Sequence, residues 1–105
     1  MIPMNPDQID VVIARRTFQV KGGREAELII GAPQPFTDGD YFRPFQVTGL
    51  GDARVYYAGG VDAYQALILA LKKITIHLLT LPEVVNGEVQ WLDGSEPNLG
   101  LLASP

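Results

Sequence analysis

One long apolar segment constrains the fold of this chain more than any other feature. The sequence GGVDAYQALILALKKI occupies residues 59–74, and no proline or glycine follows until Pro82. Asp62 is a good N-cap residue, and Gln65 three positions later completes a capping-box pattern. Pro82 cannot continue a helix, and it biases the residue before it away from helical geometry. The segment therefore predicts one helix over residues 62–80.

The helix is more apolar than a single buried face requires. At about 100° per residue, one stripe of large side chains is expected to cover a sheet: Tyr64, Leu67, Leu71, Ile74 and Leu78. Leu69 and Ile76 fall instead on the polar side. Two explanations stay open, namely that the C-terminal segment covers them or that they form an interface. We favour the first, because residues 81–105 follow the helix and must pack somewhere.

Four segments ahead of the helix have strand patterns. Residues 12–20 and 24–30 alternate, and the Gly-Gly pair between them predicts a hairpin. In the first of these, one set of side chains is expected to face the core: Val12, Ala14, Phe18 and Val20. Residues 41–49 and 54–58 predict the third and fourth strands. Pro44 has no N–H, so we expect the third strand to lie at a sheet edge or to be bulged there.

The C-terminal segment has a second hairpin signal. Asn86-Gly87, within residues 84–91, is the preferred pair for a type I′ turn. The tail after it is loop-like, with three apolar anchors: Leu99, Leu101 and Leu102. The predicted fold is therefore α+β, with an antiparallel four-stranded sheet packed by one long helix and a C-terminal hairpin or loop wrapping back. We expect residues 1–105 to form a single domain, with residues 1–8 as a loose lead-in.

The charge is acidic and unevenly distributed. The formal net charge is −4, and residues 82–105 contain no basic side chain. Such a surface repels phosphate backbones, so we expect no nucleic-acid ligand, whereas a basic protein would be steered toward it. The residues proposed to contact such a partner are Asp38, Asp40, Glu83, Glu88, Asp93 and Glu96. The alternative is a surface whose charge only aids solubility.

Side chains able to support catalysis are few. His77 is the only histidine, and Ser95 and Ser104 are the only serines, so a serine triad is not expected. The Asp-Gly-Asp of residues 38–40 lacks the closing glutamate of a calcium loop and is typical of a turn. Gly49-Leu50-Gly51 also predicts a turn, since a strand rather than a helix follows it. We therefore expect no catalytic residue, no metal and no cofactor.

The sequence also bears on localisation. There is no cysteine, which suits a reducing compartment. The N-terminus has neither the basic region nor the apolar core of a signal peptide. The longest apolar run, residues 66–71, is far too short to span a membrane. We expect a cytoplasmic protein with no membrane contact.

Several motifs together carry a family resemblance. IARRTF, GLGD, GGVDAYQALILAL and the terminal WLDG…NLG resemble a family of short bacterial proteins of unknown function. The resemblance covers about residues 13–101, and its most specific parts are GGVDAYQAL and the pattern around Trp91 and Gly100. These resemble fold determinants, a helix start and a closing loop. The family has no assigned activity, so the resemblance implies no functional residue.

A looser, class-level likeness concerns the immunity proteins that neutralise bacterial toxins, many of which are nucleases with basic clefts. Such proteins are often small, acidic and without catalytic residues. The leading hypothesis is therefore a non-enzymatic protein-binding domain, most concretely an immunity protein that binds a basic toxin. The alternative is a self-associating structural domain that forms a homodimer through Leu69 and Ile76 or through a sheet edge.

Overall fold

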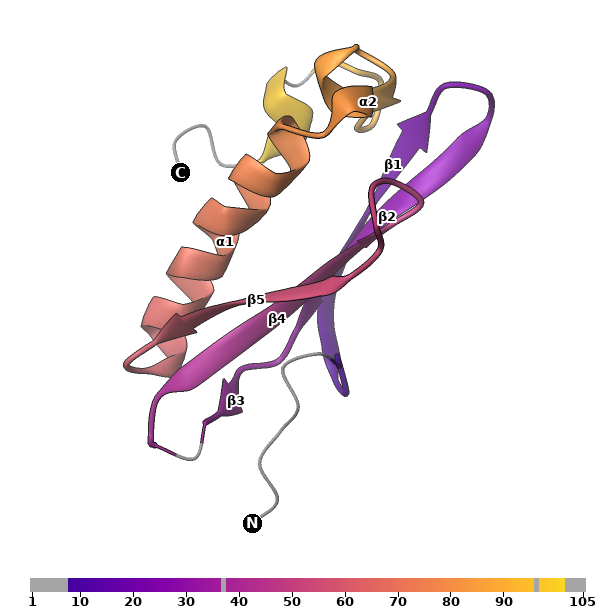
Figure 1. Cartoon of the computed structure of the whole chain (residues 1–105). Helices are drawn as coiled ribbons and strands as arrows, with labels where there is room; N and C mark the ends of the chain where they lie inside the picture. The colour runs from indigo at the N-terminus through magenta and orange to yellow at the C-terminus, as the bar shows by residue number, and fades with distance from the viewer. Residues whose placement is uncertain (1–7, 37, 96, 102–105) are drawn as a thin grey trace.

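The α+β architecture is confirmed by a computed structural model, which describes residues 8–36, 38–95 and 97–101. The strands are β1 (Val12–Val20), β2 (Arg24–Gly31), β3 (Gln34–Pro35), β4 (Tyr41–Thr48), β5 (Val55–Gly60) and β6 (Val89–Gln90). The helices are α1 (Ala63–Leu79), α2 (Pro82–Val85) and the 3-10 turn η1 (Pro97–Gly100). Figure 1 shows α1 lying along one face of the twisted sheet, with α2 and the tail at one end of the molecule.

The sheet has six strands rather than the predicted four. The two additional strands, β3 and β6, are 2 residues long each and too short to show an alternating pattern. Every pairing is antiparallel, and the order across the sheet is β6-β1-β2-β4-β5. The short strand β3 pairs with β4 on the side where β2 lies, at the other end of β4. It therefore extends the line of β2 after a two-residue break.

Pro44 lies in an interior strand, so its predicted edge position is wrong. On one side of β4 the pairing with β2 ends at Phe45, and the pairing with β3 begins at Phe42. Pro44 falls in the gap between these two pairings. The missing N–H therefore costs no hydrogen bond to β2 or β3.

The first hairpin is confirmed, with a turn one residue longer than Gly-Gly alone. Val20 pairs with Arg24, so three residues form the connection. Gly22 and Gly23 have φ values of +92° and +79°. This left-handed region is open to glycine at little steric cost.

The predicted alternation of β1 holds at one end and fails at the other. Phe18 is fully buried, as expected. Val12 pairs with Gly31, and Ala14 pairs with the adjacent residue Ile30. Ile13 is therefore one extra residue on β1 and forms a β-bulge. Val12 and Ala14 are exposed, contrary to the prediction. The bulge resets the alternation at Val12, and α1 does not reach over Ala14.

The predicted helix is confirmed at both ends. The Asp62 carboxylate accepts a hydrogen bond of 2.8 Å from the backbone N–H of Gln65. The Gln65 side-chain oxygen accepts one of 2.8 Å from the backbone N–H of Val61. Thr80 is the C-cap residue. Local capping thus sets where α1 begins.

The buried face of α1 is rotated from the predicted stripe. Its buried residues are Ala66, Ala70, Ile74, Thr75 and Leu78. Tyr64 is 72% exposed and does not cover the sheet. Because two alanines face the sheet, α1 lies close to β5. A Cβ added to Gly60 would lie 2.5 Å from the backbone nitrogen of Ala66.

The Asn86-Gly87 pair ends a helix, so the predicted second hairpin is wrong. Gly87 has φ +76°. Its N–H donates to the carbonyl oxygen of Val84 at 3.0 Å, and the N–H of Glu88 donates to that of Glu83 at 2.9 Å. This is a Schellman motif, which needs a left-handed residue at the glycine position just as a type I′ turn does. The chain then pairs with β1 instead of folding back on itself.

The tail wraps back over the core as predicted. β6 pairs with Gln19 and Val20 of β1. Leu99 is buried, and Leu101 packs against the core; the third predicted anchor, Leu102, lies outside the described residues. The core cluster consists of Phe18, Val20, Ala26, Leu28, Phe45, Val47, Leu50, Ile74, Leu78, Val89 and Leu99.

Candidate functional site

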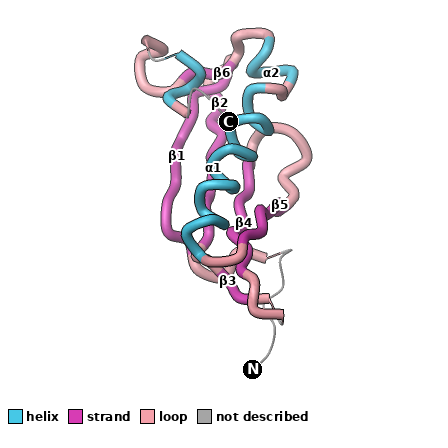
Figure 2. Tube along the Cα trace, turned by 90° about the vertical axis from the view of Figure 1, so that its left-hand side faces the viewer, coloured by secondary structure: helices cyan, strands magenta, loops and turns pink. Residues whose placement is uncertain are grey.

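The long helix covers only part of one sheet face. α1 packs mainly against β4 and β5, and the trace of β1 runs beside it (Figure 2). The first part of β1, up to Arg15, is exposed. A groove of about 250 Å³ lies between α1 and β1. We call it the α1–β1 groove. Most of the residues that line it are apolar.

The walls of the α1–β1 groove come from β1, β2, α1 and the C-terminal segment. Leu28 and Ile30 of β2 line it together with Ala14 of β1, and α1 contributes Leu71 and Thr75. The hydroxyl of Thr75 donates to the backbone oxygen of Leu71 at 3.1 Å. Its donor capacity is therefore already used within the helix. The groove accordingly offers mainly apolar contact along its length.

Three residues in mutual contact hold the tail beside this groove, and we call them the tail clamp. The guanidinium of Arg16 lies 3.8 Å from the ring centroid of Trp91. One of its terminal nitrogens, Nη1, donates to the carbonyl oxygens of Leu99 and Gly100 at 3.2 and 2.9 Å. Gly100 lies so close to Trp91 that an added Cβ would overlap the ring. Arg16, Trp91 and Gly100 thus place Leu101 at the groove wall.

The outer edge of β1 beside the groove is largely unpaired. Among the described residues, β6 pairs only with Gln19 and Val20, so residues 14–18 have no strand neighbour on that side. Ile13, in the bulge, is 52% exposed. An unpaired strand edge presents backbone donors and acceptors to other chains.

The six carboxylates expected to form a contact surface do not gather in one place. Asp38 and Asp40 lie at the turn between β3 and β4. Three others lie at the α2–β6 end: Glu83, Glu88 and Asp93. Figure 1 shows β3 and α2 at opposite ends of the molecule. The sixth, Glu96, lies outside the described residues.

Neither end of the molecule presents a purely acidic surface of free carboxylates. At the first, a carboxylate oxygen of Asp38 accepts a hydrogen bond from the N–H of Asp40 at 3.0 Å, which is the expected turn geometry. At the second, the N–H of Lys21 donates to the carbonyl oxygen of Glu88 at 2.8 Å. This contact brings the basic residue of the β1–β2 turn to the α2–β6 end, so the charge there is mixed.

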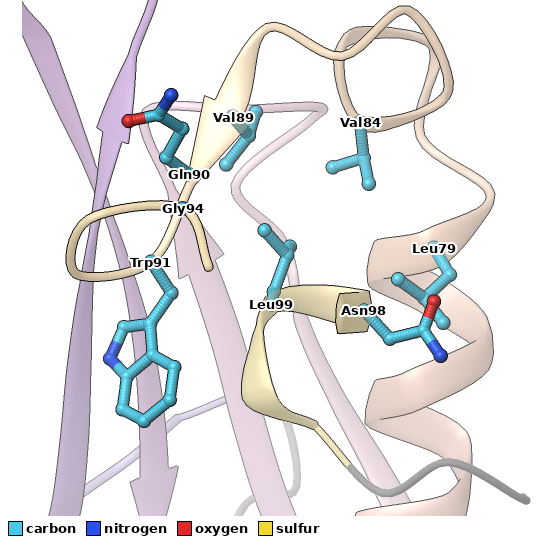
Figure 3. A pocket seen from close by; sticks show the side chains of 8 residues that line it. All are labelled: Leu79, Val84, Val89, Gln90, Trp91, Gly94, Asn98 and Leu99. Atoms are coloured by element: carbon cyan, nitrogen blue, oxygen red, sulfur yellow. The ribbon is translucent and has the colours of Figure 1, made fainter. Parts of the chain in front are cut away.

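A second hollow, of about 310 Å³, lies beside α2. Figure 3 shows Val84, Val89 and Leu99 gathered around it, with the amides of Gln90 and Asn98 nearby. None of the side chains that line it is ionisable. It offers packing and amide hydrogen bonds but no acid, base or nucleophile.

His77 lies in an aromatic cluster on the other flank of α1. Its ring centroid is 4.7 Å from that of Tyr56, whose hydroxyl donates to Asp52 at 2.7 Å. Burial lowers the pKa of His77. Hydrogen bonds from the backbone N–H of Arg54 and from the Tyr56 hydroxyl lower the pKa of Asp52. The cluster holds the turn before β5 against the helix.

The titration of His77 leads to a pH prediction. Because its pKa is lower in the folded state than the ordinary value of about 6.5, the unfolded state binds the proton first. The free energy of unfolding is therefore expected to fall as pH drops below about 6.5, and this contribution levels off below the folded-state pKa. Urea unfolding of the wild type and of His77→Gln between about pH 7.5 and pH 5 checks this. Identical slopes in the two proteins would contradict it.

Leu69 and Ile76 are exposed on the outer side of α1, at 38% and 53%. The favoured explanation, that the C-terminal segment covers them, is wrong. The pairing of β6 with β1 places the tail on the β1 side of the helix, where it contacts Arg16 and Trp91.

Two further observations concern the described part of the chain. Residues 8–36, 38–95 and 97–101 contain no group of at least 3 His, Cys, Asp or Glu side chains placed to hold a metal ion. In the same ranges no helix has the length and apolarity needed to cross a membrane.

Comparisons with known proteins add one finding. A family model described as a domain of unknown function (DUF6968) matches residues 14–103. This is close to the span of the resemblance carried by the sequence motifs. No curated protein and no solved structure gives a match.

Proposed function

We propose that this chain, which belongs to the DUF6968 family of domains of unknown function, is a non-enzymatic protein-binding domain that uses the α1–β1 groove. One observation carries the proposal: an apolar groove and an unpaired strand edge lie side by side on β1. Exposed apolar surface of this kind is typical of interaction sites. An open strand edge adds main-chain hydrogen bonds to such a contact.

Affinity capture with matched variants tests this. Ala14 lines the groove and is exposed, so Ala14→Trp fills the groove without disturbing the core. Val61 is 69% exposed and lies outside both the groove and β1, so Val61→Trp adds bulk at a site away from the proposed contact. A tagged chain is used at low salt on extracts of its native cells, and bound proteins are identified by mass spectrometry. One stoichiometric partner is expected with the wild type and Val61→Trp.

The affinity is then measured between the purified chain and the purified partner. Calorimetry is expected to show binding weakened at least about tenfold by Ala14→Trp, corresponding to about 1.4 kcal/mol, and little changed by Val61→Trp. Equal affinity for all three proteins would place the contact elsewhere. Matching thermal unfolding curves for the variants exclude misfolding as the cause.

The most concrete form of this proposal is an immunity protein that neutralises a basic bacterial toxin. The net charge of −4 supports it, as do the carboxylates of Glu83 and Glu88 near one end. Two double variants test it: Glu83→Lys with Glu88→Lys, and Asp38→Lys with Asp40→Lys. Both change the net charge equally but at opposite ends. The pair in contact is expected to weaken toxin binding several-fold and to lower its salt dependence, and unchanged affinity in both would remove this form.

Self-association is a second candidate function, favoured by the exposure of Leu69 and Ile76. These residues lie two turns apart on the outer side of α1, so a second copy could bury both. In that case Leu69→Glu is expected to turn a dimer into a folded monomer, and Thr17→Glu to leave the dimer intact. Light scattering over a range of concentrations measures the mass. A monomer at every concentration of the wild type would exclude this function.

A further inference from the structure

We propose that the α1–β1 groove receives an extended acidic segment of the protein partner. A large apolar side chain of that segment enters the groove, and a carboxylate two residues away on the same face of the segment pairs with Arg16. This inference rests on the proposed protein-binding function and names the chemistry of the partner. It differs from the expectation based on the overall charge of the chain, which favours a basic partner.

The inference rests on the charges of the side chains that line the groove. Its lining includes two arginines and no carboxylate, although the chain as a whole has net charge −4. Arg15 already forms an ion pair of 2.8 Å with Glu27. That is the one ion pair among the described residues, so Arg16 has no carboxylate partner there. A charged group that is partly withdrawn from water gains from an opposite charge.

The side chain of Arg16 is also restrained by contacts within the chain. Its stacking on Trp91 and its hydrogen bonds to two carbonyl oxygens restrain the side chain. Both hydrogen bonds use Nη1, and the guanidinium has further N–H donors at its other nitrogens. A restrained guanidinium loses little conformational entropy when it binds a carboxylate.

The size of the groove is compatible with one side chain of a protein segment. Small-molecule sites usually enclose about 300–1,000 Å³. The α1–β1 groove measures about 250 Å³ and is open to one side. It suits a single anchoring side chain, which is how buried apolar residues act at the centre of protein interfaces.

The open edge of β1 favours an extended conformation. Residues 14–18 lie between the bulge and the β6 pairing and have no strand neighbour on that side among the described residues. A segment added there would place alternate side chains on the groove side. A second copy of this chain is a poorer occupant, because antiparallel pairing of two β1 strands would bring Arg15 and Arg16 of both copies together.

Fluorescence anisotropy with labelled synthetic peptides tests the inference on the full chain. Three short peptides are compared in which every second residue is threonine. The residues between the threonines alternate leucine with glutamate, leucine with lysine, or alanine with glutamate, so that both side chains of each pair lie on one face of the extended peptide. The leucine–glutamate peptide is expected to bind at least about tenfold tighter than either of the others. Its affinity is expected to fall with salt. Ala14→Trp should abolish this binding, and Val61→Trp, at an exposed site outside the groove and away from the open edge of β1, should leave it unchanged.

NMR independently locates the site at which the peptide binds. Addition of the leucine–glutamate peptide is expected to shift the amide signals of Ala14, Leu71 and Leu101, and to spare those of Asp38 and Asp40. Equal or tighter binding of the leucine–lysine peptide would overturn the charge assignment. Failure of all three peptides to bind, or binding unaffected by Ala14→Trp, would overturn the groove assignment. The capture experiment uses no peptide and judges the protein-binding function separately.

Discussion

Replacing Gly100 by alanine is expected to lower the free energy of unfolding by about 2–4 kcal/mol. Two effects contribute, and they add only in part because the ring can shift. Gly100 has φ +67°, where an L-residue is strained by about 1–2 kcal/mol. The new methyl group would also overlap the ring of Trp91, and overpacking of this kind typically costs about 1–3 kcal/mol. The ring can yield only by leaving Arg16, so the tail clamp opens.

Gly87→Ala is the matched control. Gly87 also has a left-handed backbone, with φ +76°, but a Cβ there meets no atom within 4 Å. The control therefore measures the backbone strain without the overlap. Trp91 is the only tryptophan, so its fluorescence reports directly on the clamp during urea unfolding. Equal losses of stability in the two variants would show that the contact between Gly100 and Trp91 does not constrain the tail.

Replacing Gly60 by alanine is expected to destabilise the fold by about 1–3 kcal/mol, the usual cost of overpacking. The added Cβ would lie 2.5 Å from the nitrogen of Ala66 and 2.9 Å from the carbonyl carbon of Gln65. Both are backbone atoms in the first turn of α1. They can move only if the start of the helix moves away from β5.

The neighbouring glycine provides the control. A Cβ on Gly59 would lie 3.7 Å from the carbonyl oxygen of Tyr41, an ordinary contact. Gly59→Ala is therefore expected to change the free energy of unfolding by no more than about 0.5 kcal/mol. Thermal unfolding followed by circular dichroism distinguishes the two variants. If Gly60→Ala proves equally harmless, the close approach of α1 to β5 is not what positions the helix.

Gly60→Ala also has a consequence for binding. The approach at Gly60 sets the distance of α1 from β5, and α1 forms one wall of the α1–β1 groove. A shift of the helix changes the width of that groove. A folded Gly60→Ala protein is therefore expected to bind the partner less tightly than Gly59→Ala does.

Charge shows why the sequence and the structure favour different partners. A count along the chain detects an excess of carboxylates and predicts a basic partner. The fold sends Asp38 and Glu83 to opposite ends, and it brings Arg16 to a groove that no carboxylate lines. Recognition depends on the charges within a few ångströms of the contact, because salt screens more distant ones over about 8–10 Å.

Features specified by a few neighbouring residues were predictable. The capping of α1 at Asp62, the hairpin at Gly22 and Gly23 and the turn at Asp38–Asp40 follow from local backbone chemistry. The Asn86-Gly87 pair was ambiguous, because a left-handed glycine ends a helix as readily as it turns a hairpin. β3 and β6 were missed because strands of 2 residues have no period.

By itself, the sequence determined the α+β class, the ends of the long helix and the turns at Gly22-Gly23 and Asp38–Asp40, since each depends on contacts between residues close in the chain. Only the tertiary structure decided which apolar side chains are covered. Periodicity shows that Ala14 and Leu71 share faces with buried residues, but their exposure depends on where α1 lies on the sheet. Gly60, Ala66 and Ala70 bring the helix onto β4 and β5. The β1 side of that face therefore stays open, and the groove forms there.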